Sequence, residues 1–133
     1  MISITIPGEP IAKGRPRLGK WGTYTPLKTV NYENLVKMCY MEQCKEEQLF
    51  GELEAEIYAY FTIPKSASKK KSSDMLQGII RPVKKPDADN VAKIILDSLN
   101  SLAYNDDSQI VKLTIEKFYS NIPRVYVIIN EVK

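Results

Sequence analysis

The chain has 133 residues, of which 44% are hydrophobic and 26% charged, with a formal net charge of +3. That length supports one domain with a real core, so a single domain over residues 1–133 is expected. No apolar run approaches the ~20 residues of a membrane span, and no membrane partner is expected. Histidine is absent, which excludes Ser-His-Asp and Cys-His catalysis and every His-containing zinc site.

The cysteines and the N-terminus favour the cytoplasm. Cys39 and Cys44 lie in one predicted helix, and their spacing of five does not bring the sulfurs to bonding distance on one face. Reduced thiols are therefore expected. The chain starts in alternating, strand-like sequence with no signal-peptide pattern.

The N-terminal half predicts a strand, a loop and a helix. Isoleucines at 2, 4 and 6 alternate with Ser3 and Thr5, which predicts a strand that stops at Pro7-Gly8. Residues 11–24 are basic and broken by glycine and proline, so an irregular loop is expected. Thr25-Pro26 is a cap followed by a first-turn proline, and the helix should run to about residue 48. Its expected apolar positions include Val30, Leu35, Met38, Tyr40 and Met41.

The second half begins with the clearest strand, residues 53–63, which alternates apolar and polar side chains throughout. A mobile lysine- and serine-rich stretch follows, with a short helix near 72–76, and then an extended segment broken by two prolines. A helix is expected over 89–100. Residues 109–119 and 124–132 predict two strands joined by a hairpin turn. The fold class is α/β (α+β), one mixed sheet with helices covering one face.

Charge is distributed in blocks. Residues 10–31 carry five basic residues and no acid, residues 32–63 carry seven Glu against two Lys, and residues 64–86 carry seven basic residues against Asp74. Two basic blocks around an acidic one favour a polyanion-binding surface, although lysine-rich loops can also be merely solvated. The candidate DNA contacts are Lys13, Arg15, Arg17, Lys69, Lys70, Lys71, Lys84 and Lys85.

The helix over 89–100 separates apolar from charged residues. Its apolar stripe comprises Val91, Ile94, Ile95, Ser98, Leu99 and Leu102. The opposite side carries a charged ridge of Asp89, Lys93 and Asp97, which follow one another at i, i+4 and i+8. Leu96 and Asn100 share that side. A purely structural explanation is available, in which Asp89 caps the helix and Lys93 bridges two acids on a solvated face.

More carboxylates flank this ridge. Asp87 precedes Asp89 on an extended approach that Pro86 stiffens, and Asp106-Asp107 lies in the loop after the helix. A loop that turns back would bring Asp107 beside Asp87 and Asp89. Carboxylates so clustered repel unless a divalent cation neutralises them. Oxygen-only ligands favour Mg²⁺ or Mn²⁺.

A carboxylate-held Mg²⁺ with a nearby lysine and basic flanks fits phosphodiester chemistry. The metal activates water and neutralises phosphate charge, while Lys93 orients that water or stabilises the transition state. The basic blocks would hold a nucleic-acid backbone without reading its sequence. Residue types and spacing alone predict metal-dependent phosphoryl or nucleotidyl transfer on a nucleic acid. A bare Asp-x-Asp also occurs in glycosyltransferases and phosphohydrolases.

The stretch KPDADNVAKIILDSLN…AYNDDSQI closely resembles the RusA family of Holliday junction resolvases, found in bacteria, phages and prophages, as does the opening IPGEPIAKGRPRLGKWGTYTP. The resemblance implies a RusA-like fold and a Mg²⁺-dependent homodimer that nicks four-way DNA junctions symmetrically in recombination and repair. The alternatives are a less selective nuclease of branched or flap DNA, and a non-catalytic DNA-binding module.

The resemblance also implies roles for individual residues. It makes Asp87, Asp89 and Asp107 the essential acids and metal ligands and Lys93 the catalytic lysine. Asp106 is a further candidate ligand, and the choice between Asp106 and Asp107 stays open. The same pattern makes Asn90 and Asp97 supporting residues.

Overall fold

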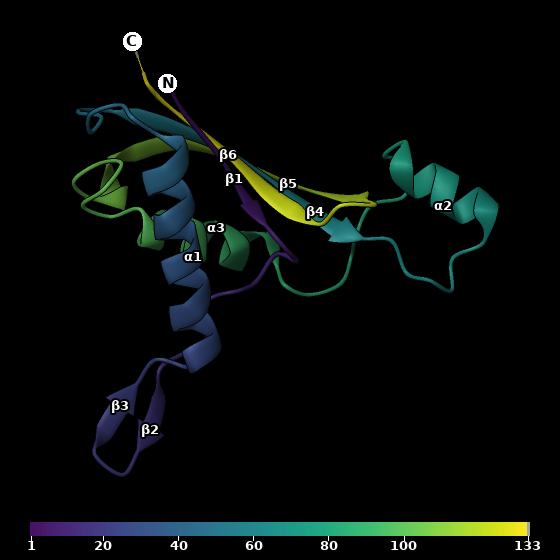
Figure 1. The fold of residues 1–133 in the computed structure, drawn as a ribbon, viewed down its shortest axis with the longest axis horizontal. Coiled ribbons are helices and arrows are strands. Elements are labelled where there is room, and N and C mark those ends of the chain that lie inside the picture. Colours follow the sequence, from purple (N-terminus) through teal and green to yellow (C-terminus); the bar gives the residue numbers. More distant parts are fainter. Residues whose placement is uncertain (133) are drawn as a thin grey trace.

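The computed structural model describes residues 1–132 and contains one four-stranded mixed sheet. The strands are β1 (Ile2–Pro7), β4 (Leu53–Thr62), β5 (Ile110–Ser120) and β6 (Arg124–Glu131), in the spatial order β1-β6-β4-β5. β6 pairs antiparallel with both β1 and β4, and β5 pairs parallel with β4. The expected α+β class, one mixed sheet with helices on one face, is confirmed (Figure 1).

The expected hairpin pairing of the last two strands is wrong. A short turn does join β5 to β6, but β4 lies between them in the sheet. The five alternate residues of β4 from Leu53 to Phe61 are all buried, whereas β5 has no buried residue. The most apolar strand therefore occupies an interior position, and β5 takes the edge.

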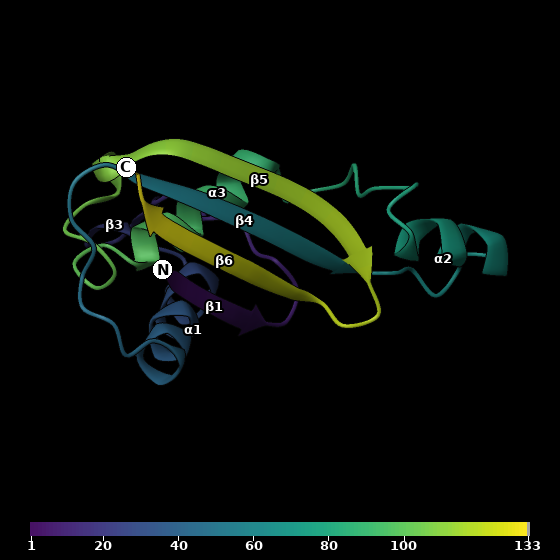
Figure 2. The ribbon, with the colours of Figure 1, turned by 90° about the horizontal axis from the view of Figure 1, so that it is seen from above.

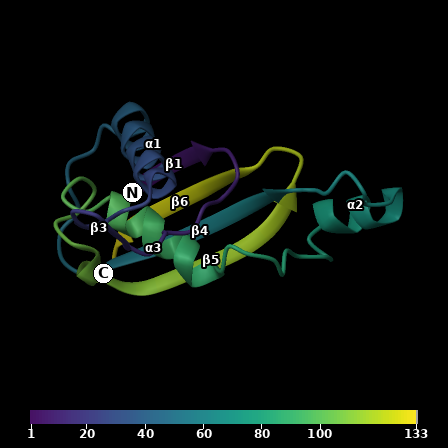
Figure 3. The same cartoon turned by 90° about the horizontal axis from the view of Figure 1, so that it is seen from below.

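Three α-helices complete the domain over residues 1–132. α1 (Leu27–Gln43) and α3 (Ala88–Ser98) lie on one face of the sheet, and α2 (Lys69–Leu76) extends beyond its end (Figure 1; Figure 3). The parallel pair β4–β5 requires a crossover, and that crossover carries α3 onto the buried face. The core lies between this face and the two helices, with isoleucines of β1, valines of β6 and the apolar side of α3 at its centre. Among the described residues, no helix is long and apolar enough to cross a membrane.

Two boundaries differ from the sequence prediction. α1 begins after Pro26, which occupies the N-cap position without a side-chain hydrogen bond, and ends at Gln43, five residues early. After Cys44 the chain leaves the helix so that Leu49 is buried, with its N–H bonded to the carbonyl oxygen of Ala103 (2.9 Å). This tertiary contact overrides local helix propensity.

The side chains buried by α1 are also partly different from those expected. The helix buries Thr29, Tyr32, Val36, Cys39 and Tyr40, while Met38 and Met41 remain about 60% exposed (60% and 62%). Both cysteines are free thiols, as expected.

The basic loop contains structure that the sequence pattern concealed. β2 (Arg17–Gly19) and β3 (Gly22–Tyr24) form a small antiparallel hairpin that extends away from the sheet (Figure 1). The lysine-rich stretch forms α2, longer than expected, and Ser68 caps it by accepting a hydrogen bond from the N–H of Lys71. The proline-containing segment before α3 is irregular, with no strand.

Candidate functional site

α3 presents the charged ridge that its sequence predicts. Its apolar side chains are buried, including Leu96, which the periodicity had placed on the charged side. Asp89 and Lys93 are exposed and Asp97 is half-buried. Lys93 Nζ lies 3.7 Å from a carboxylate oxygen of Asp97, so the expected i, i+4 pair forms on its C-terminal side.

Asp87 occupies the N-cap position of α3. Its backbone is extended, and its carbonyl oxygen accepts the first helical hydrogen bond from Val91 N. Its exposed side chain makes no capping hydrogen bond. The carboxylate of Asp87 therefore remains available at the positive end of the helix, where an anion is favoured.

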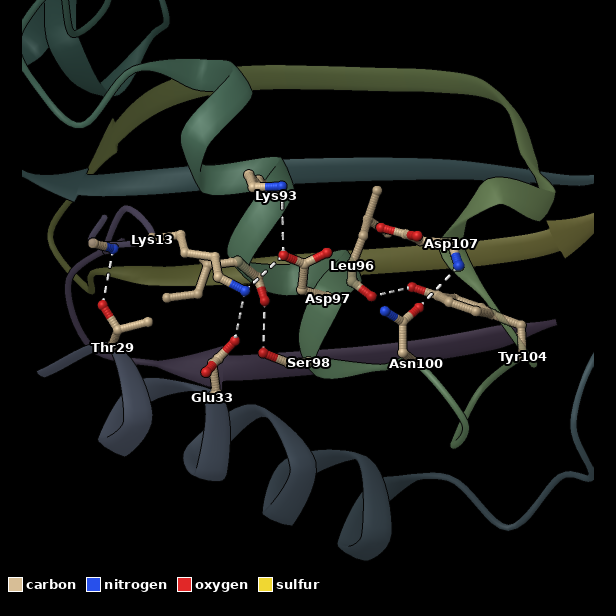
Figure 4. Close-up of polar contacts among 12 residues, drawn as sticks. Lys13, Thr29, Glu33, Lys93, Leu96, Asp97, Ser98, Asn100, Tyr104 and Asp107 are labelled. Atoms are coloured by element: carbon tan, nitrogen blue, oxygen red, sulfur yellow. Dashed lines mark hydrogen bonds and ion pairs between the residues drawn. The ribbon is translucent and has the colours of Figure 1, made fainter. Parts of the chain in front are cut away.

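Lys13 anchors the N-terminal loop to both helices. Its ammonium group donates to Asp97 Oδ2 at 2.8 Å and to Glu33 Oε2 of α1 at 3.4 Å (Figure 4). Burial disfavours the charge of Lys13, but these two acids outweigh it and raise the pKa of Lys13. Gly14 allows the close approach, since a Cβ there would lie 2.8 Å from Thr29 Oγ1, which accepts the Gly14 N–H. Lys13 was expected to contact phosphate, and the structure places it in this ion-pair network.

Asp107 lies beside Asp97, and the two carboxyl groups shift each other's pKa. Burial raises the pKa of Asp107, and the neighbouring Asp97 carboxylate raises it further. Burial also opposes ionisation of Asp97, but hydrogen bonds from Lys13 and Asp107 outweigh it and lower the pKa of Asp97. Asp107 is thus the member of this carboxyl pair that binds a proton first, as expected of two acids that share one site.

Two hydrogen bonds position Asp107. Its N–H donates to Asn100 Oδ1 at 2.8 Å, directly after the end of α3 (Figure 4). The buried Tyr104 hydroxyl donates to the carbonyl oxygen of Leu96 at 2.6 Å and holds the loop against the helix. Sequence reasoning placed Asn100 on the charged side of the helix without a role and did not select Tyr104, because neither residue bears a charge.

Asp106 has a different local role from its neighbour. It caps the 3₁₀ turn Asp107–Gln109, where its carboxylate accepts the N–H of Ser108 and Gln109 Oε1 accepts the N–H of Asp106. The hydrogen bond from Ser108 lowers the pKa of Asp106. The carboxylate of Asp106 therefore stabilises the turn, while that of Asp107 faces the ridge.

The expected convergence of three carboxylates is not present. Within residues 1–132, no three Asp, Glu, Cys or His side chains are close enough together to hold a metal ion. The acids form two groups instead, with Asp87 and Asp89 at the start of α3 and Asp97 beside Asp107 near its end. Mg²⁺ typically binds one or two carboxylates, several waters and substrate phosphate oxygens, so these oxygen donors fit Mg²⁺ in kind and number.

A groove connects Asp87 to the N-terminal basic block. Its volume is about 440 Å³, and its lining includes Arg17, Lys28, Lys85, Asp87 and Asn90. The predicted supporting residue Asn90 thus faces the same space as Asp87 and three cations. The three cations give the groove the positive charge that attracts a polyanion, and they would hold it next to the exposed carboxylate of Asp87.

The remaining predicted DNA contacts lie on exposed segments. Arg15 precedes the hairpin, Lys69, Lys70 and Lys71 form the first turn of α2, and Lys84 precedes the groove. Close to Lys84 is Lys117, which the sequence analysis did not select. Lys117 Nζ donates to the carbonyl oxygen of Lys84 at 2.6 Å, and burial lowers its pKa although Asp87 is nearby.

Comparison with known proteins shows the family to which the chain belongs. The model of the family "Endodeoxyribonuclease RusA" matches residues 7–130, which is nearly the whole chain. A carboxylate ridge and a cationic groove on this mixed α+β domain thus belong to an endodeoxyribonuclease that acts on Holliday junctions. The chain is a member of the RusA endodeoxyribonuclease family. It is also 41% identical over 137 residues to the uncharacterized protein YqaN of Bacillus subtilis (strain 168), covering 98% of this chain and 96% of that protein.

Proposed function

We propose that this protein is a Mg²⁺-dependent resolvase that cuts four-way DNA junctions by paired symmetric nicks during recombination and repair in the cytoplasm. The observation that supports it best is the position of the free Asp87 carboxylate in a groove lined by Arg17, Lys28 and Lys85. Three cations suited to a DNA backbone lie beside a carboxylate that makes no hydrogen bond to another group within residues 1–132. This arrangement favours phosphodiester cleavage over passive DNA binding.

The ligand set follows from side-chain availability. We assign Mg²⁺ to Asp87 and Asp89 at the start of α3 and to Asp107 near its end, two groups of acids that the ion would draw together from their separate positions in the metal-free protein. Asp106 is left out of the ligand set because its carboxylate is engaged in capping its turn. When bound, the ion would supply activation of a water and neutralisation of charge on the scissile phosphate. Manganese has the same ligand preference and can replace it.

The protein's own side chains would orient the substrate and stabilise charge. Arg17, Lys28 and Lys85 hold the strand along the groove by contacts to phosphate oxygens. Lys93, exposed on the ridge and paired only loosely with Asp97 at 3.7 Å, would stabilise the negative charge that develops on the phosphate. Lys13 acts indirectly, because it fixes Asp97 and thereby the position of Asp107.

A homodimer fits both the substrate and the sheet. A four-way junction has two-fold symmetry, and a two-fold dimer presents two identical sites to opposed strands. Among residues 1–132, no helix covers the outer face of the sheet (Figure 2). That face carries the tilted and stacked aromatic rings of Tyr58, Tyr60 and Phe118, and Arg124 lies 4.0 Å from the Tyr60 ring centre. We propose that this face joins two copies.

The decisive test compares three DNA substrates of matched sequence: a four-way junction, a 5′ flap and a linear duplex, each with Mg²⁺ or with EDTA. Paired nicking of the junction alone, only with Mg²⁺, supports the proposal. Equal cutting of the flap would indicate a less selective nuclease. Asp87→Asn should abolish nicking and retain junction binding. Binding with no nicking of any substrate by the wild type would instead indicate a DNA-binding module.

A further inference from the structure

The β2–β3 hairpin carries apolar side chains that the fold does not use. Trp21 at its tip is 92% exposed, Leu18 is 87% exposed and Tyr24 is 51% exposed. The hairpin extends away from the sheet and both packed helices (Figure 1). A fully exposed tryptophan stabilises no core, and exposed large apolar groups that gather on one element indicate a binding surface.

The hairpin is built to hold its tip in one place. Gly22 adopts a φ of +117°, which a residue with a side chain rarely does, and the two-residue turn Lys20-Trp21 depends on it. Across the strands, the ring of Tyr24 covers Gly19, where a Cβ would lie 3.0 Å from the ring. The Lys20 ammonium lies 5.5 Å from the centre of the Trp21 ring. The turn therefore presents one aromatic ring together with one cation.

Charge identifies the kind of partner. Residues 10–31, which include the hairpin, carry five basic residues and no acidic one. A partner for this segment is therefore an anion, and an exposed indole beside cations fits an anion that also offers a flat aromatic surface. Nucleic acid has both, since aromatic side chains stack on unpaired bases while cations follow the backbone.

The position of the hairpin favours branched DNA over other nucleic acids as the partner. Arg17, the first residue of β2, also lines the groove that contains Asp87, so hairpin and groove are continuous. A linear duplex keeps its bases stacked along its length, whereas base pairs that border an open branch point each have one face without a stacking neighbour, and an aromatic ring can stack on such a face. We propose that Trp21 stacks on a base at the branch point and thereby sets where the backbone enters the groove, an inference that rests on the proposed function.

The chain itself supplies the probe for this proposal. Trp21 is its only tryptophan, whereas the chain has eight tyrosines. Fluorescence of the full-length protein excited at the red edge of the absorption band, where tyrosine does not absorb, therefore reports on this ring alone. In EDTA, where nicking is not expected, a four-way junction should strongly quench the emission, and a linear duplex of matched sequence should not.

Substitution gives the energetic readout. Stacking on one base contributes about 1–3 kcal/mol, so Trp21→Ala should weaken junction binding by roughly 5- to 150-fold and leave duplex binding within about twofold. Trp21→Phe should retain most of the affinity, and Thr23→Ala on the same hairpin serves as the matched control. Binding is measured by anisotropy of labelled DNA, and unchanged thermal unfolding shows that the variants fold.

The outcomes distinguish this inference from the proposed function. If the wild type binds and nicks the junction while Trp21 emission is unchanged and Trp21→Ala binds normally, the stacking role is wrong and the resolvase proposal stands. If quenching is equal with junction and duplex, the branch-point assignment is wrong. If the wild type neither prefers nor nicks junctions, both proposals fail together.

Discussion

At the residue scale, Asp97 and Asp107 show how the fold stores electrostatic repulsion. The two carboxyl groups are neighbours, and Lys13 neutralises only one of them at 2.8 Å. An acid whose pKa is raised in the folded state binds its proton too tightly there. The resulting loss of stability builds up as the pH rises from the ordinary pKa of an aspartate to the raised pKa of the folded state, and it is fully present at neutral pH. A cation that binds the pair would relieve it.

The repulsion between Asp97 and Asp107 predicts how Asp107→Asn changes thermal stability and its response to Mg²⁺. The substitution removes one charge and keeps a polar group of the same shape, so the metal-free protein should unfold a few degrees higher at pH 7. Wild-type protein should gain thermal stability from millimolar Mg²⁺, because a ligand of the native state stabilises it by mass action. Asp107→Asn should lose most of that gain. Scanning calorimetry in EDTA and in Mg²⁺ measures both effects.

Asp106→Asn provides the matched control at the adjacent position. Asparagine caps a helical turn about as well as aspartate, so this variant should unfold at nearly the wild-type temperature and keep its response to Mg²⁺. A loss of the response in Asp106→Asn, with retention in Asp107→Asn, would reverse the roles assigned to the two acids.

Lys13 links three segments through two ion pairs, so its removal should be costly. Lys13→Ala leaves Asp97 and Glu33, with side chains only 18% and 20% exposed, without their shared cation. The expected loss is about 1–3 kcal/mol of unfolding free energy. Urea denaturation measures it, with Lys20→Ala as the control because Lys20 is exposed and forms none of the ion pairs within residues 1–132. Equal stability of the two variants would contradict the anchoring role.

At the element scale, periodicity predicted the strands and α3 well. β4 and α3 each have one apolar face in sequence and one buried face in the structure. The failures arise where distant contacts decide. α1 ends early because Leu49 packs beside Ala103, and β5 and β6 separate because β4 enters between them. No local pattern encodes either event.

The candidate site likewise has one part that the sequence predicts and another that only the structure reveals. The ridge of Asp89, Lys93 and Asp97 follows directly from helical spacing, and the Lys93–Asp97 pair is observed. The partnership of Lys13 with Asp97 joins residues 84 positions apart, so no spacing rule could reveal it. The relation between Asp106 and Asp107 also required the turn geometry, because only a capping interaction distinguishes two adjacent acids.

α2 yields a prediction about DNA binding. Its first turn, Lys69-Lys70-Lys71, is exposed and lies at the far end of the sheet from the hairpin (Figure 1). If these lysines contact phosphates, replacing all three by alanine should lower the slope of log K against log salt by up to about 3. Filter binding between 50 and 200 mM salt measures the slope. Lys37→Ala on the exposed side of α1 should leave it unchanged, and an unchanged slope in the triple variant would exclude the contact.

At the scale of the whole molecule, the charges of the uncovered sheet face favour the pairing of two copies proposed above. Glu54 and Glu56 at the start of β4 outnumber Lys112, which pairs with Glu54 across the strands, so this end carries an excess of negative charge. Arg124 opposes Tyr60 near the other end, where Arg124 and Arg81 outnumber Glu116. Arg81 lies 4.1 Å from the centre of the Phe118 ring on the neighbouring strand. A two-fold axis near the middle of β4 would place the acidic end of one copy over the basic end of the other, with the aromatic rings between them.

This arrangement predicts the effect of a single charge on assembly. Phe118→Glu puts a carboxylate among the aromatic rings of both copies at once, so it should convert a dimer to a monomer while each monomer stays folded. Sedimentation equilibrium of the wild type and the variant measures the change. Ile122→Glu, in the exposed turn between β5 and β6, is the matched control and should leave the dimer intact.

Because each protomer has one site, the Phe118→Glu monomer should lose paired cutting and retain only slow single nicks. A variant that is still dimeric and nicks in pairs would exclude this face as the interface, and a monomeric wild type would exclude the dimer itself.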